Sequence, residues 1–156
     1  IEPDIANWRL LERNTRDYER KLNFYGAVAG QDGELRLVDP GLSDCGFRTE
    51  ATDASTDGAG LIVEAICPAS ILEHPATAGM NPLIFKIDIE GGEDGLFAGN
   101  TDWMRRFPLL IIELHDWMLP FSGSSRNFLR ALARHDFDLV HRGENLFLFN
   151  RELLRP

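Results

Sequence analysis

The feature that most constrains the fold is an apolar strand in which every second residue is ionisable. Residues 83–93 read Leu-Ile-Phe-Lys-Ile-Asp-Ile-Glu-Gly-Gly-Glu. Because side chains alternate across a strand, Lys86, Asp88 and Glu90 share one face and the apolar residues share the other. A row of buried ionisable groups costs free energy unless the groups are paired or open onto a cleft. The stretch therefore predicts a strand whose carboxyl end, closed by two glycines, forms part of a ligand site.

The acidic end of this strand also has a purely structural explanation. Lys86 could pair with a neighbouring carboxylate, and Asp88 could cap the helix that follows. Capping requires only one carboxylate, so the presence of Glu90 beside Asp88 favours a site, while the role of Lys86 stays open.

A second apolar strand, over residues 109–114, ends in the same way. Glu113 and His115 fall on one face at its carboxyl end. An imidazole beside a carboxylate serves as a general base near neutral pH, and the same two groups bind divalent ions. Taken alone, His115 would be interpreted as a surface histidine at a strand end. Beside Asp88 and Glu90 on an adjacent strand, it predicts a shared site.

Strands and helices alternate along the rest of the chain. An amphipathic helix is expected over residues 4–20, and residues 39–60 are expected to form a surface loop. Further strands are expected over residues 22–29, 34–38 and 61–66, further helices over 69–74, 93–99 and 124–135, and a hairpin over 137–149. This order predicts one α/β domain spanning residues 1–156, with a doubly wound sheet and an antiparallel C-terminal hairpin.

Composition limits the partners that the chain can have. Of its 156 residues 44% are hydrophobic, which is enough for one domain with its own core. The net charge of −9 disfavours nucleic acid and anionic membranes, and no stretch reaches the ~20 apolar residues of a membrane span. Cys45 and Cys67 lack the spacing of metal ligands, and we expect them to be free thiols of a cytoplasmic protein.

The beginning of the chain gives one more indication. Glu2 and Pro3 lead directly into the first expected helix. An acidic residue at the end of a strand commonly holds the ribose hydroxyls of a nucleotide cofactor. A lone glutamate before a helix is more often a partner of the helix dipole, so Glu2 by itself is weak evidence for a cofactor site.

Several segments together resemble the FkbM family of S-adenosylmethionine-dependent methyltransferases. The central motif over residues 85–93 is similar to that family's most recognisable motif, which normally ends Gly-Ala-Glu and here ends Gly-Gly-Glu. Residues 108–115, which end in Glu-Leu-His, resemble the next strand. The remaining matches are Glu-Pro-Asp at residues 2–4 with the Asn and Leu residues up to 14, Gly-Ala-Val-Ala at 26–29 with Asp-Gly at 32–33, and the closing strand at 145–151.

This resemblance implies a class I, Rossmann-like methyltransferase that uses S-adenosylmethionine to methylate a hydroxyl of a sugar or secondary metabolite. Glu2 would bind the cofactor ribose, Ala27 and Val28 would flank its adenine, and Asp88 would lie near its methionine end. The catalytic residues would be His115, Glu113 and Glu90, close to a small-molecule or carbohydrate acceptor. We expect His115 to be the base with Glu113 orienting it; a divalent ion held by Asp88, Glu113 and His115 is the variant.

The chain departs from the family in one important respect. The Gly-rich loop that follows the family's first strand is missing from this sequence. In the family fold this strand lies centrally, between the strands that end at Glu2 and at Asp88. The sequence is therefore expected to correspond to the C-terminal part of the domain, and residues 1–156 alone are expected not to bind the cofactor tightly. A nicotinamide-dependent oxidoreductase and a non-catalytic binding domain with the same fold are the alternatives.

Overall fold

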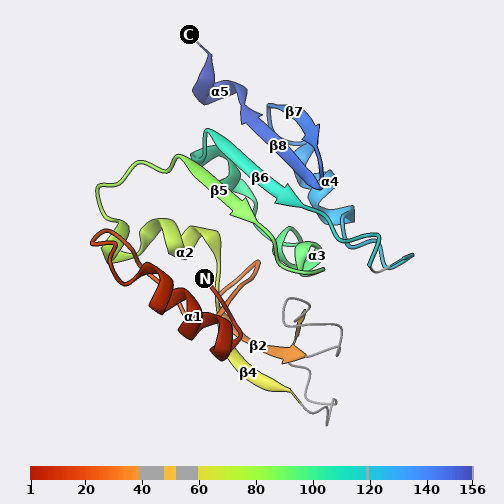
Figure 1. Cartoon of the computed structure of the whole chain (residues 1–156). Helices are drawn as coiled ribbons and strands as arrows, with labels where there is room; N and C mark the ends of the chain where they lie inside the picture. Colours follow the sequence, from red (N-terminus) through yellow and green to blue (C-terminus); the bar gives the residue numbers. More distant parts are fainter. Residues whose placement is uncertain (39–47, 52–59, 119, 156) are drawn as a thin grey trace.

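The structure is a computed structural model that describes the chain except for residues 39–47, 52–59, 119 and 156 (Figure 1). It contains two four-stranded sheets. The first sheet has the order β1-β4-β2-β3 and consists of β1 (Ala27–Val28), β2 (Gly33–Val38), β3 (Arg48–Ala51) and β4 (Leu61–Ile66). The second has the order β5-β6-β8-β7 and consists of β5 (Ile84–Ile87), β6 (Leu109–Glu113), β7 (Phe137–Arg142) and β8 (Asn145–Asn150).

Short helices connect these strands. They are α1 (Ile5–Thr15), α2 (Pro68–Glu73), α3 (Glu93–Leu96), α4 (Arg126–Leu132) and α5 (Arg151–Leu154), with the 3-10 helices η1 (Pro75–Thr77) and η2 (Asp102–Arg106). The expected α/β class is confirmed. No described helix has both the length and the apolar character that crossing a membrane requires. Cys67 is a free thiol at the start of α2, and Cys45 lies outside the described residues.

The first helix begins where the sequence predicts it. The Asp4 carboxylate accepts hydrogen bonds from the backbone N–H groups of Ala6 and Asn7, at 2.9 and 2.8 Å, and so caps α1. The helix ends at Thr15, earlier than the predicted residue 20. After it the chain turns back, and Tyr25 packs its ring against Trp8 with ring centroids 5.8 Å apart.

The first sheet corrects two predictions. Residues 48–51, expected within a loop, form β3 because they pair antiparallel along the edge of β2. The strand expected over residues 22–29 is limited to Ala27–Val28, which pairs with β4. Before it, Tyr25 makes an isolated parallel bridge to Glu2. Both differences arise from long-range pairing, which a local pattern does not contain.

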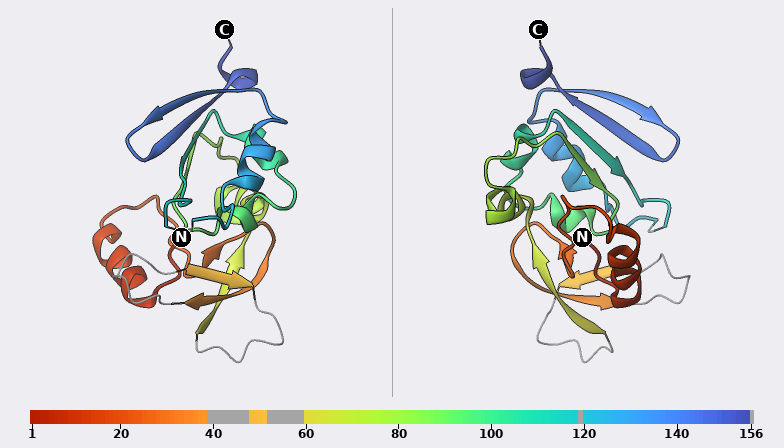
Figure 2. Two further views of the ribbon diagram at one scale, coloured as in Figure 1. Left: turned by 90° about the vertical axis from the view of Figure 1, so that its right-hand side faces the viewer. Right: turned by 60° about the vertical axis from the view of Figure 1, so that its left-hand side comes forward.

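The second sheet contains the predicted hairpin. Strands β5 and β6 are parallel, while β8 lies antiparallel between β6 and β7. Figure 2 shows α3 and α4 on the same side of the β5–β6 pair. Their buried side chains pack with η2 against that face and form the larger core cluster: Ile87, Leu96, Phe97, Trp103, Met104, Phe107, Leu110, Ile112, Phe128, Ala131 and Leu148.

The division into two sheets differs from the single doubly wound sheet that the sequence predicts. In the described part of the chain, no strand lies between the Glu2–Tyr25 bridge and β5, so nothing joins the two hydrogen-bond ladders. The sheets instead approach each other through glycines. A Cβ atom on Gly30 would lie 2.5 Å from the carbonyl oxygen of Gly95 in α3, so an alanine there would force the two parts to shift.

Asn150 connects the end of β8 to two neighbouring segments. Its buried side chain donates to the carbonyls of Arg105 and Phe107, at 3.1 and 3.2 Å, and accepts from the N–H groups of Glu152 and Leu153 in α5. We expect Asn150→Ala to lower the free energy of unfolding by about 2 kcal/mol, because it removes a helix cap and leaves buried carbonyls unpaired. Urea denaturation measures the loss. The exposed Asn81→Ala is the control, expected within about 0.5 kcal/mol of the wild type.

Candidate functional site

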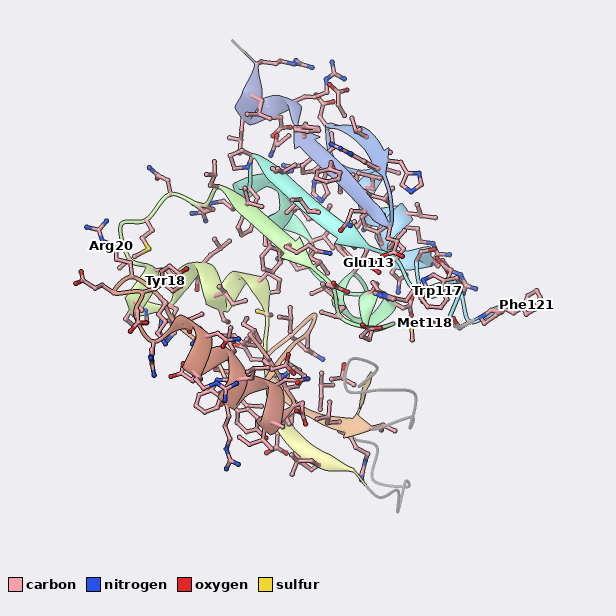
Figure 3. The ribbon with its side chains drawn as sticks, viewed as in Figure 1. Tyr18, Arg20, Glu113, Trp117, Met118 and Phe121 are labelled. Atoms are coloured by element: carbon pink, nitrogen blue, oxygen red, sulfur yellow. The ribbon has the colours of Figure 1, made fainter. Side chains whose placement is uncertain are left out.

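The carboxyl ends of β5 and β6 lie side by side. The two strands are parallel and pair Ile84 with Leu109 through to Ile87 with Ile112. This register brings the residues that follow β5 next to the end of β6. The predicted alternation holds within β5, because Ile87 is buried in the core and Lys86 is exposed on the other face. The ionisable residues of the two strands therefore meet at one edge of the second sheet, where Figure 3 labels Glu113.

His115 lies at the centre of this group. Its side chain is only 2% exposed, and its Nε2 atom lies 3.5 Å from Glu90 Oε2 and 3.7 Å from both Asp88 Oδ1 and Glu113 Oε1. Its Nδ1 atom lies 2.5 Å from Glu93 Oε1. The structure thus brings together Asp88, Glu90, Glu113 and His115, which the sequence predicts to share one site. It buries His115 instead of leaving it on the surface, because β6 ends at Glu113 and the strand alternation ends with it.

Glu93 is the residue that the sequence analysis missed. It was expected only to begin a helix, yet its side chain is fully buried and makes the hydrogen bond to His115 Nδ1. Glu90 and Gly91, at φ 49° and 92°, turn the chain sharply after β5, so that α3 starts beneath the site. The Gly91 N–H donates to the same Glu93 oxygen at 3.3 Å. The feature of the sequence that could have identified Glu93 is the pair of glycines directly before a carboxylate at the start of a helix.

The role expected for Glu113 changes accordingly. Glu113 was expected to orient the His115 ring, but the carboxylate that accepts the ring hydrogen bond is Glu93, and Glu113 faces the opposite ring nitrogen. Glu113 also lies 3.7 Å from Lys86 Nζ. Lys86 is 3.4 Å from Asp88 and donates to Asn145 at 2.8 Å, so the salt-bridge interpretation of Lys86 agrees with the structure.

The charges in the site shift the pKa values of two groups. Burial raises the pKa of Glu90; the charge of His115 lowers it, and the carboxylates of Asp88, Glu113 and Glu93 raise it further. Burial lowers the pKa of His115, but the hydrogen bond and charge of Glu93, with the charges of Glu90 and Asp88, outweigh burial and raise it overall. The cluster therefore favours a positive charge on or near His115.

A cavity of about 240 Å³ opens next to this cluster, between the two sheets. Its lining includes all the residues that the resemblance gave to the cofactor: Glu2, Ala27, Val28 and Asp88, together with Glu90. One oxygen of Glu2 accepts the backbone N–H of Asp4 at 2.8 Å. A carboxylate accepts through both oxygens, so this bond leaves Glu2 able to bind a ligand hydroxyl. Val28 also lines a larger hollow of about 850 Å³, bordered by glycines 91, 92 and 95.

An exposed apolar segment follows His115. Figure 3 shows Trp117, Met118 and Phe121 beyond Glu113, on the segment that leaves the end of β6. Trp117 is 71% exposed, and Phe121 is fully exposed with φ 68°. These two aromatic side chains belong to neither core cluster and are exposed to solvent.

Comparisons with models of protein families, with curated proteins and with solved structures find no match for this chain. A buried imidazole fixed at one nitrogen and facing carboxylates at the other is suited to accepting a proton or to holding a cation.

Proposed function

We propose that the chain is part of an S-adenosylmethionine-dependent methyltransferase that methylates a hydroxyl group of a sugar or another small metabolite. One observation carries the proposal. Asp88 lines the cavity that also contains Glu2, Ala27 and Val28, and the same Asp88 lies 3.7 Å from His115. A cofactor that Glu2 holds in this cavity could also contact Asp88, beside the imidazole cluster where an acceptor hydroxyl could meet it.

The arrangement of the strands supports the same proposal. The resemblance expects an antiparallel C-terminal hairpin after parallel strands, and β8 lies antiparallel beside β6. It also expects the strand with the Gly-rich loop between those ending at Glu2 and at Asp88. The break between the two sheets falls at this position.

The reaction makes modest demands on the protein. The cofactor supplies an activated methyl group, so the protein has to hold a hydroxyl in line with that methyl and accept its proton. The Glu93 carboxylate keeps the proton of His115 on Nδ1, which leaves the Nε2 lone pair directed at the acceptor side of the cluster. Glu90 and Asp88 then stabilise the imidazolium that forms when Nε2 takes the proton.

Methyl transfer from labelled S-adenosylmethionine to a panel of hydroxylated acceptors tests the proposal in the intact protein. We expect a labelled methyl ether, and we expect Glu2→Gln to raise the KM for the cofactor about 10–100-fold with little change in kcat, because a charge-assisted hydrogen bond to the ribose is weakened. Glu19→Gln, an exposed carboxylate outside the cavity, is the matched control.

Two results would contradict the proposal. Hydride transfer with a nicotinamide cofactor, in place of methyl transfer, would make the protein an oxidoreductase that uses Glu2 in the same way. Acceptor binding without turnover on any member of the panel would make it a non-catalytic binding domain.

A further inference from the structure

We infer that Asp88, Glu90 and His115 bind a divalent transition-metal ion, while Glu93 fixes the imidazole from behind. One potential ligand atom from each of the three residues lies within 4.8 Å of the others. The inference deepens the proposed function, because it names an ion at the place where the acceptor hydroxyl would react. The catalytic role of the ion rests on the proposed function, whereas the binding of the ion does not.

The distances fit an ion better than they fit hydrogen bonds. Nε2 of His115 lies 3.5–3.7 Å from oxygens of Glu90, Asp88 and Glu113, beyond the usual 2.7–3.2 Å of an N–H···O bond. Two ligand atoms that each lie ~2.1 Å from a metal, at a near-tetrahedral angle, are about 3.4 Å apart. The distances from Nε2 to the Asp88 and Glu90 oxygens are thus those of ligands that share a metal ion.

The burial of His115 is a second and independent observation. A side chain that is 98% buried points Nε2 at these carboxylates without an ordinary hydrogen bond. Nε2 can carry at most one proton, which can serve only one of the three carboxylates at a time. A cation at the centre would contact Asp88 and Glu90 at once.

The charge balance of the site leads to the same conclusion. Four carboxylates, Asp88, Glu90, Glu93 and Glu113, surround the His115 ring. Among the described residues, Lys86 is the cation that pairs with this group, so carboxylates outnumber cations even when His115 is protonated. A divalent ion offsets the remaining negative charge.

Glu93 would hydrogen-bond the metal-binding imidazole without contacting the ion itself. Metal-binding histidines usually donate their second ring N–H to a carboxylate, which fixes the tautomer and the direction of the ring. The Nδ1–Glu93 hydrogen bond of 2.5 Å, made by a fully buried carboxylate, has this geometry. The donor set of one imidazole and two carboxylates suits Mn²⁺ or Zn²⁺ better than Mg²⁺, which prefers oxygen ligands and retains water.

The ion and the base role use the same lone pair. With an ion on Nε2, the acceptor hydroxyl would bind the ion, which makes the hydroxyl more acidic, and its proton would leave to Glu113, the carboxylate outside the ligand set. In the metal-free protein the proton goes to His115. Loss of His115 is therefore expected to lower the rate of methyl transfer in both the metal-bound and the metal-free protein, and only a measurement of metal binding distinguishes the two.

Titration with Mn²⁺, followed by the electron paramagnetic resonance signal of the free ion and without cofactor or acceptor, tests the site. We expect one bound Mn²⁺ and a dissociation constant that rises about 10–100-fold in Asp88→Asn and in Glu90→Gln. Asp94→Asn, an exposed carboxylate next to Glu93, should leave it unchanged. Circular dichroism establishes that each variant is folded. Co²⁺ absorption gives a second measurement on the same proteins, and low-coordinate bands should appear in the wild type.

Three results would overturn the inference: Mn²⁺ that does not bind below about 1 mM, affinity unchanged in Asp88→Asn and Glu90→Gln, or Mg²⁺ binding as tight as Mn²⁺ and insensitive to His115→Gln. Metal binding without methyl transfer would refute the proposed function alone. Methyl transfer at full rate in a chelator, by a protein that binds no Mn²⁺, would refute the ion alone.

Discussion

Replacing His115 by glutamine should lower the kcat for methyl transfer by about 10²–10⁴-fold and leave cofactor affinity almost unchanged. The reason is the position of the ring. Nε2 faces Glu90 and Asp88, where the acceptor would lie, whereas Glu2 would hold the cofactor in the proposed function. Single-turnover kinetics with labelled cofactor measure the chemical step, and calorimetry measures cofactor binding.

His141→Gln is the matched control for this prediction. His141 lies exposed on β7, outside the site, and the substitution should leave both quantities unchanged. If His115→Gln turned over as fast as the wild type, His115 would be neither the base nor a ligand that the reaction needs. The cluster would then have a structural role only.

Replacing Glu93 by alanine should lower the free energy of unfolding by about 3–5 kcal/mol, the largest effect on stability that we expect at the site. The substitution leaves the buried His115 Nδ1 without its partner and opens space beneath the sheet. Urea denaturation followed by circular dichroism measures the loss. Glu93→Gln keeps an oxygen that can accept the Nδ1 hydrogen bond, and it should cost clearly less.

The neighbouring Asp94→Ala controls for effects on the first turn of α3 and is expected within about 0.5 kcal/mol of the wild type. A Glu93→Ala protein as stable as the wild type would mean that the Glu93–His115 pair does not form in solution.

The parts of the site that follow from strand geometry could be predicted from the sequence. Alternation along β5 put Lys86 on the face opposite Ile87, and the parallel register of β5 and β6 brings the residues that follow β5 next to Glu113. These predictions succeed because the two-residue period of a strand and the common edge of parallel strands are local rules.

The parts that depend on turns and distant pairing could not be predicted. Glu93 reaches His115 only because Glu90 and Gly91 adopt left-handed backbone conformations. β6 ends at Glu113, so the alternation of faces along a strand does not apply to His115, and its burial could not be predicted from that rule. In the same way, β3 forms because it pairs with the edge of β2, and the sequence of residues 48–51 alone does not predict this pairing.

The outer edge of β5 has a consequence of its own. In the described part of the chain this strand pairs only with β6, and the apolar side chains Leu83 and Ile84 beside it are 66% and 53% exposed. Such an edge presents unpaired backbone N–H and C=O groups together with exposed hydrophobic side chains, and edges of this kind pair with extended segments of other molecules. Crowding, storage at high concentration and partial heating should therefore cause this chain to cluster through β5 sooner than through its charged surfaces.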